Sequence, residues 1–446
     1  MQKIGQVLLE EILQILKNSN LFLTGGGGVG KSYLTSAVIA YYKSELKNVI
    51  VLGSTGISAV NIGGVSVHSF FKFGICNDFN ELKAYDKRQK DKLSKLRAIL
   101  DSADLIVFDE ISMISANILE MIYLRLNSSK FKGRLMFVGD FYQLPPVKKN
   151  ENQNALFSFN YAFSSHAWQS FKLVNVELKI SKRTQDERFY TMLSKLRVGD
   201  VGDDVIRYIA SLLTPKFEPD ANTSVLFGTN FGVDRLNNMM LARLNSPNFT
   251  LKADLKIIDE TLNEKRLQSF KNSLNVPEAL EVKLGAKVIF ATNKWGSYYN
   301  GERGEIVQVV RDDNEISEVI VKKDNGELCE VGRNVFELME FVMRDGEIWQ
   351  ETLATFSQFP FKLAYALTIH KSQGMSIKNL MCDLNNIFAN GQLYVALSRA
   401  IDPAYLKLFY NKRLDFSRYL QSVVKIDDEV RKFYAENEFK NIKESF

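Results

Sequence analysis

Short apolar segments alternate with amphipathic, helix-like segments through the first third of the chain. The apolar segments cover residues 21–24, 49–54, 105–109 and 135–138. Near-continuous apolar strands separated by helices are typical of a parallel sheet with helices on both faces. The pattern therefore predicts an α/β domain built on a parallel sheet, which we assign to residues 1–180.

Two segments of this domain have a different pattern. Residues 1–16 repeat apolar side chains at helical spacing, interrupted by Glu10 and Glu11, which predicts an amphipathic helix that covers the sheet. Residues 72–100 lose the alternation and are rich in Lys and Asp. We interpret this second stretch as a small insertion that emerges from the first domain.

The second half of the chain predicts another α/β sheet with a β-rich module inserted in it. Strand candidates at residues 225–228, 363–369 and 405–409 can form the second sheet. Between them lie short strand candidates and Gly- and Asn-rich turns, including the hairpin signal Asp-Asn-Gly at 324–326. The inner strand candidates are residues 288–290, 305–310, 318–322 and 327–331.

These patterns predict the fold class and the domain boundaries. The fold is α/β, with two parallel-sheet domains and an insertion in each. We assign residues 181–250 and 355–425 to the second α/β domain, and residues 251–354 to the β-rich module. The highly charged residues 426–446 are predicted to form a surface helix or a frayed tail.

The composition fits a globular protein of several domains. The chain has 446 residues, 46% of them hydrophobic, which is more than a single core accommodates. A formal charge of +5 permits an anionic polymer as partner, but it also fits an ordinary surface with a small excess of Lys. Cys76, Cys329 and Cys382 lack C-x-x-C spacing, which argues against a zinc site or disulfides and suits a reducing compartment. No apolar run approaches the roughly 18 residues of a membrane span.

The strongest chemical signal follows the first strand candidate. Residues 25–32 read Gly-Gly-Gly-Gly-Val-Gly-Lys-Ser, a full match to G-x-x-x-x-G-K-[ST], and a helical stretch comes next. Glycines let backbone N–H groups surround phosphate oxygens, while Lys31 adds positive charge and Ser32 offers a hydroxyl to Mg²⁺. This segment predicts a nucleoside triphosphate site.

Polar residues at later strand ends extend the predicted site. Asp109 and Glu110 end the strand candidate at 105–109, where one carboxylate can hold Mg²⁺ through water and the other can polarise an attacking water. Gln143 follows the next strand and can sense a γ-phosphate, although its Pro-rich loop also fits a stiffened turn. Arg399 can reach a phosphate across a domain cleft.

Taken in order, these motifs resemble one family. They are the phosphate loop, Asp-Glu-Ile-Ser-Met at 109–113, Gly-Asp-Phe-Tyr-Gln-Leu-Pro-Pro at 139–146, Thr-Ile-His-Lys-Ser-Gln-Gly at 368–374 and Tyr-Val-Ala-Leu-Ser-Arg at 394–399. The order resembles superfamily-one DNA helicases of the B class, most closely the PIF-one (petite integration frequency) type, which are relatives of RecD helicases. The segment from Glu177 to Gly199 resembles the signature of that family.

The resemblance implies two RecA-like domains with ATP and Mg²⁺ in the cleft between them. It also implies that the insertion at 72–100 is a wedge and that the β-rich module is SH3-like. The implied catalytic residues are Lys31, Asp109, Glu110, Gln143, Arg183 and Arg399, the two arginines reaching the γ-phosphate from the second domain. The implied nucleotide-binding residues are Gly25, Gly26, Gly27, Gly28, Val29, Gly30, Lys31, Ser32, Tyr33 and Gly374, and the metal-binding residues are Ser32 and Asp109.

A strand-binding surface is also implied. A protein that moves along DNA must hold it without reading its sequence, which favours hydroxyls and amides on phosphates and aromatic faces beneath bases. By resemblance, the contact residues are Thr55, Gly56, His68, Ser69, Phe71, Asn230, Thr368, His370 and Lys371. One of Phe70 and Phe71 is expected in the core, because adjacent strand residues point to opposite faces. Trp295, Tyr298 and Tyr299 fit base stacking and shaping of the β-rich module equally well.

The implied function is that of an ATP-dependent 5′-3′ DNA helicase. Its expected partners are single-stranded DNA and tailed or forked duplex DNA, without a membrane partner, and the free protein is expected to be monomeric. The resemblance also implies roles in DNA replication, repair, recombination and telomere maintenance. We expect a cytoplasmic, nucleoid-associated protein or a phage-encoded protein in a bacterial host.

Other interpretations of the sequence stay open. A P-loop ATPase of the clamp-loading or chaperone-like kind would have no need for residues 368–374. A second alternative binds nucleic acid and ATP without processive unwinding. The adenine-reading glutamine of the family has two candidates here, Gln2 and Gln6.

Overall fold

The computed structural model describes residues 2–54, 58–59, 62–74, 79–146, 161–313 and 315–440. Within these ranges, none of the helices combines the length and hydropathy that a membrane span requires. Two of the three cysteines, Cys329 and Cys382, are buried free thiols, and Cys76 lies outside the described residues.

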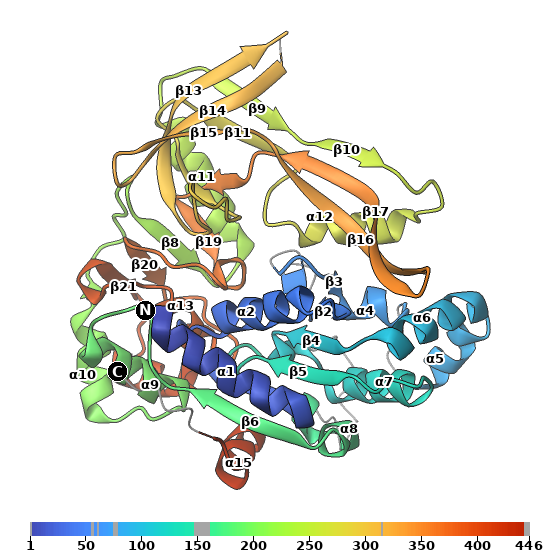
Figure 1. Cartoon of the computed structure of the whole chain (residues 1–446). Helices are drawn as coiled ribbons and strands as arrows, with labels where there is room; N and C mark the ends of the chain where they lie inside the picture. The colour runs from blue at the N-terminus through green and yellow to red at the C-terminus, as the bar shows by residue number, and fades with distance from the viewer. Residues whose placement is uncertain are drawn as a thin grey trace.

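Six parallel strands form the first sheet (Figure 1). Each of the four strands predicted for this sheet is present, and two edge strands join them. The edge strands are shorter or less buried, so their apolar signal in the sequence is weaker. In spatial order the strands are β3 (Val65–Ser66), β2 (Val49–Gly53), β4 (Leu105–Asp109), β5 (Arg134–Val138), β1 (Asn20–Gly25) and β6 (Leu173–Leu178).

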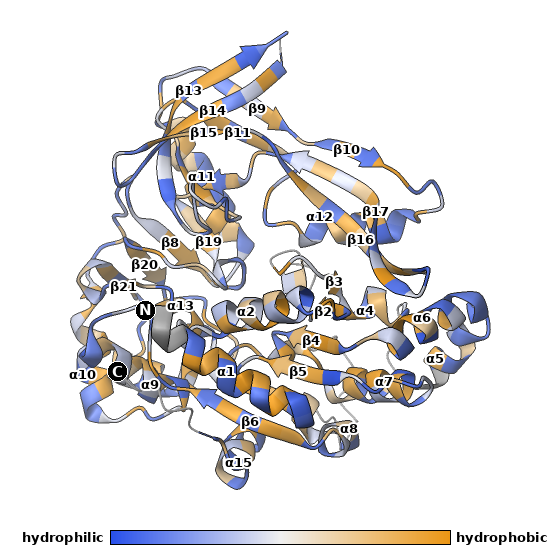
Figure 2. Cartoon of the chain, viewed as in Figure 1, coloured by the Kyte–Doolittle hydropathy of each residue, from blue (hydrophilic) through white to orange (hydrophobic). Residues whose placement is uncertain are grey.

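Helices cover both faces of this sheet, as the apolar strand pattern predicts. Leu21 and Leu23 pack under one layer of helices, whereas Phe22 between them joins the core on the opposite face. Figure 2 shows hydrophobic residues along β4 and β5, between the helical layers. The first layer is α1 (Gln2–Asn18) and α2 (Lys31–Ser44), and the second includes α4 (Val67–Phe70), α6 (Lys90–Ser102), α7 (Ala116–Asn127) and α8 (His166–Ser170).

Helices within the stretch 72–100, which was interpreted as an insertion that emerges from the first domain, pack into the core of the first lobe. The stretch contains α5 (Phe79–Asp86) and α6, which send Leu82, Leu96 and Ile99 into the core. Asp86 also accepts two hydrogen bonds from Arg125 of α7, at 2.6 and 2.7 Å. The abundant Lys and Asp residues of this stretch hid its apolar face in the sequence.

A second parallel sheet forms the core of the other lobe. The predicted stretch 363–369 is divided between two sheets, because the chain passes from the antiparallel module into the parallel sheet after Leu363. The strand at 380–383 was missed. The spatial order is β19 (Ala366–Thr368), β8 (Ser224–Phe227), β20 (Leu380–Asp383), β21 (Leu406–Phe409) and β7 (Leu213–Thr214). The associated helices are α9 (Glu187–Arg197), α10 (Asp203–Ser211), α11 (Asn230–Ala242), α13 (Gln392–Leu397) and α14 (Phe416–Val423), with the 3₁₀ turns η3 (His370–Ser372) and η4 (Pro403–Tyr405).

The β-rich module contains a five-stranded antiparallel sheet, and all four strands predicted there are present. Its order is β15 (Leu328–Val331), β14 (Glu315–Lys323), β13 (Arg303–Asp312), β12 (Lys287–Phe290) and β18 (Phe361–Leu363). The sequence pattern did not predict the remaining elements, which are β9 (Asn248–Lys252), β10 (Asp254–Ile257), β11 (Ala279–Lys283), α12 (Glu264–Ser273), β16 (Asn334–Arg344) and β17 (Glu347–Gln358).

The long hairpin of β16 and β17 reaches across to the first lobe. Phe341 meets Phe70 edge-on, with ring centroids 5.7 Å apart. Glu340 forms ion pairs with Lys72 at 2.9 Å and with Arg266 of α12 at 2.7 Å. Figure 1 shows the hairpin over α4. The β-rich module therefore contacts both lobes.

The described part of the predicted charged segment, residues 426–440, packs against the first lobe. Helix α15 (Asp428–Glu436) buries Val430 and Phe433 in the core beneath the first sheet. Lys440 then pairs with Val176 beside β6. The high charge of this segment concealed an apolar face with helical spacing, which the charge count alone does not show.

Candidate functional site

The phosphate loop joins the carboxyl end of β1 to the start of α2. Gly28 and Gly30 have φ angles of 82° and 95°, a left-handed backbone that glycine adopts at little cost. The Lys31 ammonium donates hydrogen bonds to the carbonyls of Gly25 and Gly26, at 2.6 and 2.9 Å. The strand, loop and helix therefore follow the order that the motif predicts.

Close packing from the second lobe leaves little room for a side chain at Gly27 or Gly28. A β-carbon added to Gly28 would lie 2.6 Å from Cβ of Arg183, and one added to Gly27 would lie 3.0 Å from Ser398 Oγ. Backbone N–H groups and the positive end of α2 remain as the recognition elements, and they suit phosphate oxygens. The loop therefore fits the triphosphate of a nucleotide.

Two carboxylates lie at the carboxyl end of β4. Asp109 ends the strand, and Glu110 adopts a left-handed conformation with φ 52° and ψ 48°, an unusual state for a non-glycine residue. Burial and the neighbouring Glu110 charge raise the pKa of Asp109 to about 7. Burial also raises the pKa of Glu110, opposed by the charges of Lys31 and Arg399. The pair thus shares its cleft with cations from both lobes.

Gln143 lies in the loop that follows β5. Its side-chain Nε2 donates to Asp140 Oδ2 at 3.2 Å, and both side chains are buried. Burial alone would raise the pKa of Asp140, but the charge and hydrogen bonds of Arg197 outweigh it, so the pKa is lowered. Asp140 is therefore a buried carboxylate that orients the predicted γ-phosphate sensor.

Arg183 and Arg399 approach the phosphate loop from the second lobe. Arg183 donates to Ser376 Oγ at 2.9 Å and to the Ser398 carbonyl at 2.6 Å. Arg399 donates to the Val395 carbonyl and to Ser398 Oγ, both at 2.9 Å. A β-carbon added to Gly27 would lie 3.3 Å from Arg399 Nη2. The structure thus brings both predicted arginines beside the loop.

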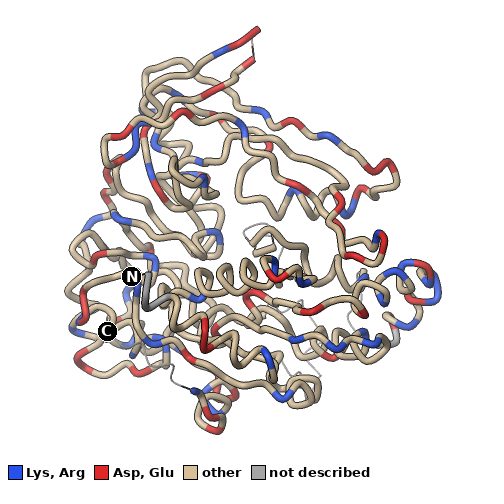
Figure 3. The backbone as a smooth tube through the Cα atoms, viewed as in Figure 1, with Lys and Arg blue, Asp and Glu red and all other residues tan. Residues whose placement is uncertain are grey.

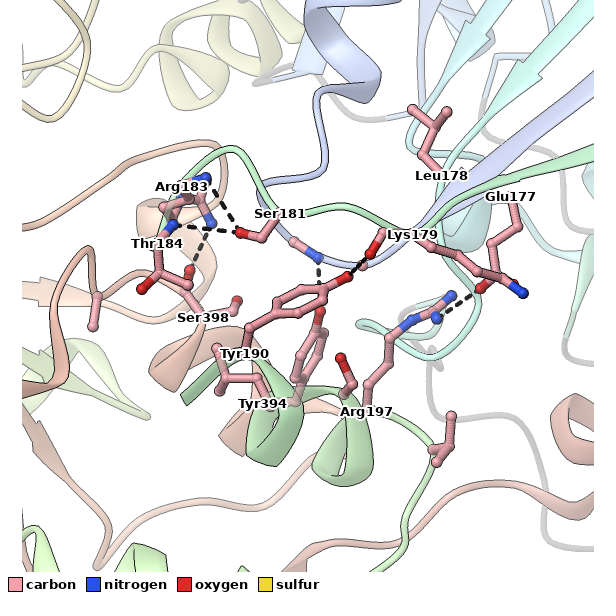
Figure 4. A pocket seen from close by; sticks show the side chains of 16 residues that line it. Glu177, Leu178, Lys179, Ser181, Arg183, Thr184, Tyr190, Arg197, Tyr394 and Ser398 are labelled. Atoms are coloured by element: carbon pink, nitrogen blue, oxygen red, sulfur yellow. Dashed lines mark hydrogen bonds and ion pairs between the residues drawn. The ribbon is translucent and has the colours of Figure 1, made fainter. Parts of the chain in front are cut away.

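A cavity of about 240 Å³ lies between the phosphate loop, the end of β6 and α9 (Figure 4). Tyr394 of α13 borders it, and its hydroxyl accepts a hydrogen bond from the Gly27 N–H at 2.6 Å. Burial raises the pKa of Tyr394 to about 12, so the hydroxyl keeps its proton at neutral pH. Tyr394 lies in the motif at 394–399, but no role was predicted for it, because nothing in the local sequence indicates its contact with Gly27.

The other predicted nucleotide and metal residues differ in exposure. Val29 is buried, whereas Ser32 and Tyr33 are exposed on the first turn of α2. Gly374 lies after η3 with open space at its α-carbon. No group of three His, Cys, Asp or Glu side chains suited to a metal occurs in the part of the chain that the structure describes. Mg²⁺ commonly binds through one or two protein oxygens and the nucleotide phosphates, and Ser32 and Asp109 fit that role.

The second-lobe residues predicted to hold DNA lie together. Asn230 is exposed at the start of α11, directly after β8, and Thr368 ends the neighbouring parallel strand β19. Thr368 Oγ1 accepts a hydrogen bond from the Lys371 N–H at 3.2 Å. His370, at the start of η3, is half-buried, and this burial lowers its pKa. These side chains form one group at the carboxyl edge of the second sheet.

The first-lobe DNA residues are only partly brought to the surface. Thr55 and Gly56 lie outside the described residues. His68 is exposed and Ser69 is half-buried, both on α4. These two side chains remain candidates for contact with a strand.

The prediction for Phe71 is wrong in this structure. Its ring is 0% exposed and stacks on Phe73 and Phe108, with centroids 5.5 and 6.2 Å apart. The preceding Phe70 is also buried. The prediction assumed a strand with alternating faces, whereas residues 67–70 form a helical turn that directs both rings inward.

Exposed aromatic side chains provide further candidate contacts. Phe388, which the sequence analysis missed, is 70% exposed, and its ring lies 6.4 Å from His370 and nearly parallel to it. Trp295 is 91% exposed and Tyr299 about half exposed, whereas Tyr298 is buried against Phe290. Tyr298 therefore shapes the β-rich module, and the other aromatics can meet a ligand.

Comparison with known proteins identifies similar chains. The PIF1-like helicase family matches residues 2–205, and a second family described as Helicase matches residues 297–421. The ATP-dependent DNA helicase Pif1 of Campylobacter jejuni is 42% identical over 438 residues, covering 97% of this chain and 98% of that protein.

Two solved structures show the same fold. Bacteroides sp Pif1 in complex with ADP-AlF4 has a TM-score of 0.79 at 24% identity, covering 97% of this chain and 98% of the other. Bacteroides Pif1 bound to ssDNA has a TM-score of 0.63 at 25% identity, covering 96% of each chain. The two-lobed α/β fold with parallel sheets is therefore shared with these proteins.

Proposed function

Since the chain belongs to the PIF1-like helicase family and is an ATP-dependent DNA helicase, we propose that it moves 5′ to 3′ along single-stranded DNA and separates the duplex ahead. The observation that supports the proposal most directly is the approach of Arg183 and Arg399 to the phosphate loop from the second lobe. Hydrolysis in that cleft can then depend on how the two lobes are placed.

Each polar group at the cleft has a proposed role. Lys31 binds the β- and γ-phosphates, Glu110 polarises the attacking water, and Gln143 senses the γ-phosphate. Arg183 and Arg399 stabilise the charge that develops during phosphoryl transfer, a role that contributes about 10³–10⁵ in rate in related chemistry. Ser32 and Asp109 hold Mg²⁺, which neutralises phosphate charge when it is bound with ATP.

Coupling to movement follows from the placement of these groups. Arg183 and Arg399 draw the lobes together around bound nucleotide and release them after hydrolysis. The first lobe holds the strand through His68 and Ser69, and the second through Asn230, Thr368, His370 and Lys371. Because the two lobes hold the strand with different strengths before and after hydrolysis, each cycle of ATP hydrolysis moves the protein in one direction along the strand.

Helices α5 and α6 are proposed to act as the wedge at the fork. Lys and Arg residues recur along both helices and the turn between them, as the colouring of the backbone in Figure 3 shows. Such a surface suits the phosphate backbone of the duplex, and each base-pair step to be opened costs about 1.4 kcal/mol. The exposed basic residues are Lys83, Lys87, Arg88, Lys90, Lys92, Lys95 and Arg97.

The partners are proposed to be single-stranded DNA and tailed or forked duplexes. A similar Bacteroides protein solved with ssDNA supports the first of these. We further propose that the free protein is monomeric, that it works at the nucleoid of a bacterial cell, and that the two lobes and the β-rich module are separate domains, with the end of the module moved from residue 354 to the end of β18.

A strand-separation assay tests polarity and the nucleotide site together. Fluorescent duplexes with a 5′ tail should be opened in the presence of ATP and Mg²⁺, whereas 3′-tailed duplexes should stay paired. Lys31→Ala should abolish DNA-stimulated ATP hydrolysis and leave single-strand binding measurable. An ATP hydrolysis rate that does not change when oligonucleotide is added, together with no strand separation, would instead identify a P-loop ATPase that does not unwind DNA.

A further inference from the structure

A buried ion pair joins the loop after β5 to helix α9 of the second lobe. Arg197 donates from Nε and Nη2 to the two carboxylate oxygens of Asp140, at 2.9 and 3.0 Å, and from Nη1 to Glu177 at 2.8 Å. Asp140 is fully buried. Leu193 and Leu196, on the same helix as Arg197, belong to the core of the second lobe. The pair therefore connects the two lobes directly behind the phosphate loop.

The hydroxyl of Tyr434, from the C-terminal helix α15, enters the same cluster. It is 2.9 Å from Thr24 Oγ1, accepts from the Phe141 N–H at 3.3 Å and donates to Asp140 at 3.4 Å. Its ring stacks on Tyr142 with a centroid distance of 4.4 Å. Thr24 directly precedes the phosphate loop, so this hydroxyl links that loop's strand to the loop after β5.

Gln143 takes its orientation from the same carboxylate. Asp140 Oδ2 accepts both Arg197 Nε and Gln143 Nε2, at 2.9 and 3.2 Å. One amide hydrogen of Gln143 is thereby committed, which leaves the other hydrogen and Oε1 for a ligand. The Tyr142 N–H also donates to Asp140 Oδ1, at 3.2 Å. Loss of the Arg197 or Tyr434 hydrogen bonds would leave the carboxylate less firmly oriented, and the Gln143 amide would lose part of its fixed direction.

We propose that Arg197 and Tyr434 are positioning residues for Gln143, acting through Asp140, and that they make the γ-phosphate sensor respond to the placement of the second lobe. This inference rests on the proposed role of Gln143. A buried ion pair adds little stability over an apolar replacement, because desolvation offsets its attraction, so its geometry is the contribution expected here. The C-terminal helix thus becomes part of the nucleotide machinery.

Tyr434→Phe tests the proposal because it removes one hydroxyl and keeps the stacked ring. We expect kcat for DNA-stimulated ATP hydrolysis to fall about three- to tenfold, as the loss of one oriented hydrogen bond predicts. KM for ATP should stay within about twofold, because ground-state binding is unchanged. Affinity for ADP with aluminium fluoride should fall with kcat, while affinity for ADP alone should not change.

Tyr365→Phe is the matched control. Its hydroxyl accepts a hydrogen bond from the Lys287 N–H at 3.0 Å, in a buried site between the second lobe and the β-rich module. It should lower the melting temperature by removing a buried hydroxyl and leave kcat unchanged. Equal kcat in both variants and in the unaltered protein would overturn the inference. Absence of DNA-stimulated hydrolysis in the unaltered protein would instead defeat the proposed function.

Arg197→Lys provides a second measurement. Lysine keeps the positive charge but cannot donate two parallel hydrogen bonds to Asp140. The same selective loss of aluminium fluoride affinity is expected, with a larger fall in kcat than Tyr434→Phe gives. Glu177→Gln keeps an oxygen acceptor for Arg197 Nη1 and leaves the Asp140 contact in place, so its kcat should fall less than that of Arg197→Lys. Full activity of folded Arg197→Lys protein would contradict the proposal.

Discussion

At the scale of single residues, burial sets the protonation of several groups near the ligand surfaces. Burial and the charge of Arg399 lower the pKa of Arg183 to about 9, which still leaves this arginine mostly cationic at neutral pH. Burial and the charge of Lys371 lower the pKa of Lys362 to about 7. Lys362 donates to Asn275 Oδ1 at 2.6 Å. Lys362 is therefore poised to lose its proton beside a residue proposed to hold phosphate.

Lys362→Met should flatten part of the pH dependence of stability. An unfolded lysine has a pKa of about 10.4, so the lowered folded value means that the unfolded chain binds more protons between pH 7 and 10. The contribution of Lys362 to the free energy of unfolding is fully present above about pH 10, and it is lost as the pH falls through the pKa of Lys362 in the folded protein. Melting temperature should thus rise less from pH 7.5 to 9.5 in the variant than in the unaltered protein. An identical rise in both would show that Lys362 titrates normally.

At the scale of elements, helix α4 combines a core role with a proposed contact role in one turn. Ser66 caps the helix by accepting from the Ser69 N–H at 3.4 Å. The turn directs Phe70 and Phe71 into the core and leaves His68 exposed. Stability and strand contact should therefore be separable by substitutions only three residues apart.

Phe71→Ala should mainly reduce stability, whereas His68→Ala should mainly reduce affinity for single-stranded DNA. Phe71→Ala should lower the free energy of unfolding by about 3–5 kcal/mol, because it empties a fully buried aromatic site. His68→Ala should change that energy by less than about 0.5 kcal/mol. Its affinity for single-stranded DNA should instead fall about fivefold, the equivalent of one modest contact.

Urea unfolding and fluorescence anisotropy with a labelled oligonucleotide distinguish the two effects. DNA affinity of Phe71→Ala is to be compared at equal concentrations of folded protein. If Phe71→Ala lost more DNA affinity than His68→Ala, Phe71 would have to be counted among the residues that contact the strand.

At the scale of the whole molecule, charge has to be judged by its placement. The net charge of +5 is small for a protein of 446 residues, so non-specific attraction over the whole surface is weak. Proposed strand contacts are instead gathered at the carboxyl edges of the two parallel sheets, where Lys371 is exposed. Salt dependence should therefore report a limited number of local phosphate contacts.

Lys371→Ala should reduce that salt dependence by one contact. The slope of log affinity for single-stranded DNA against log salt should become shallower by about 0.7. Lys17→Ala is the control, because Lys17 lies in the last turn of α1 at the opposite edge of the first sheet, where its carbonyl accepts a hydrogen bond from Arg134. A titration from low to moderate salt should leave the control slope unchanged. Equal slopes of log affinity against log salt in all three proteins would show that Lys371 does not contact the strand.

The sequence by itself determined the elements whose information is local. The glycine loop, the four predicted strands of the first sheet and the carboxylates at 109 and 110 are each encoded by neighbouring residues. Glycine backbone freedom and the strand ends then place the phosphate-binding and acidic groups. Motif order was enough to anticipate two lobes around one nucleotide cleft. It also anticipated the placement of Arg183 and Arg399 beside the loop, although their catalytic role stays a prediction.

Only the tertiary structure decided which distant residues meet. Arg197 and Tyr434 reach Asp140 from 57 and 294 positions away, and Tyr394 reaches Gly27 from 367 positions away. The burial of Phe71 and the docking of α15 likewise depend on surfaces supplied by other elements. Local spacing sets which face a side chain takes, but packing between elements decides what that face contacts, and no local pattern contains that partner.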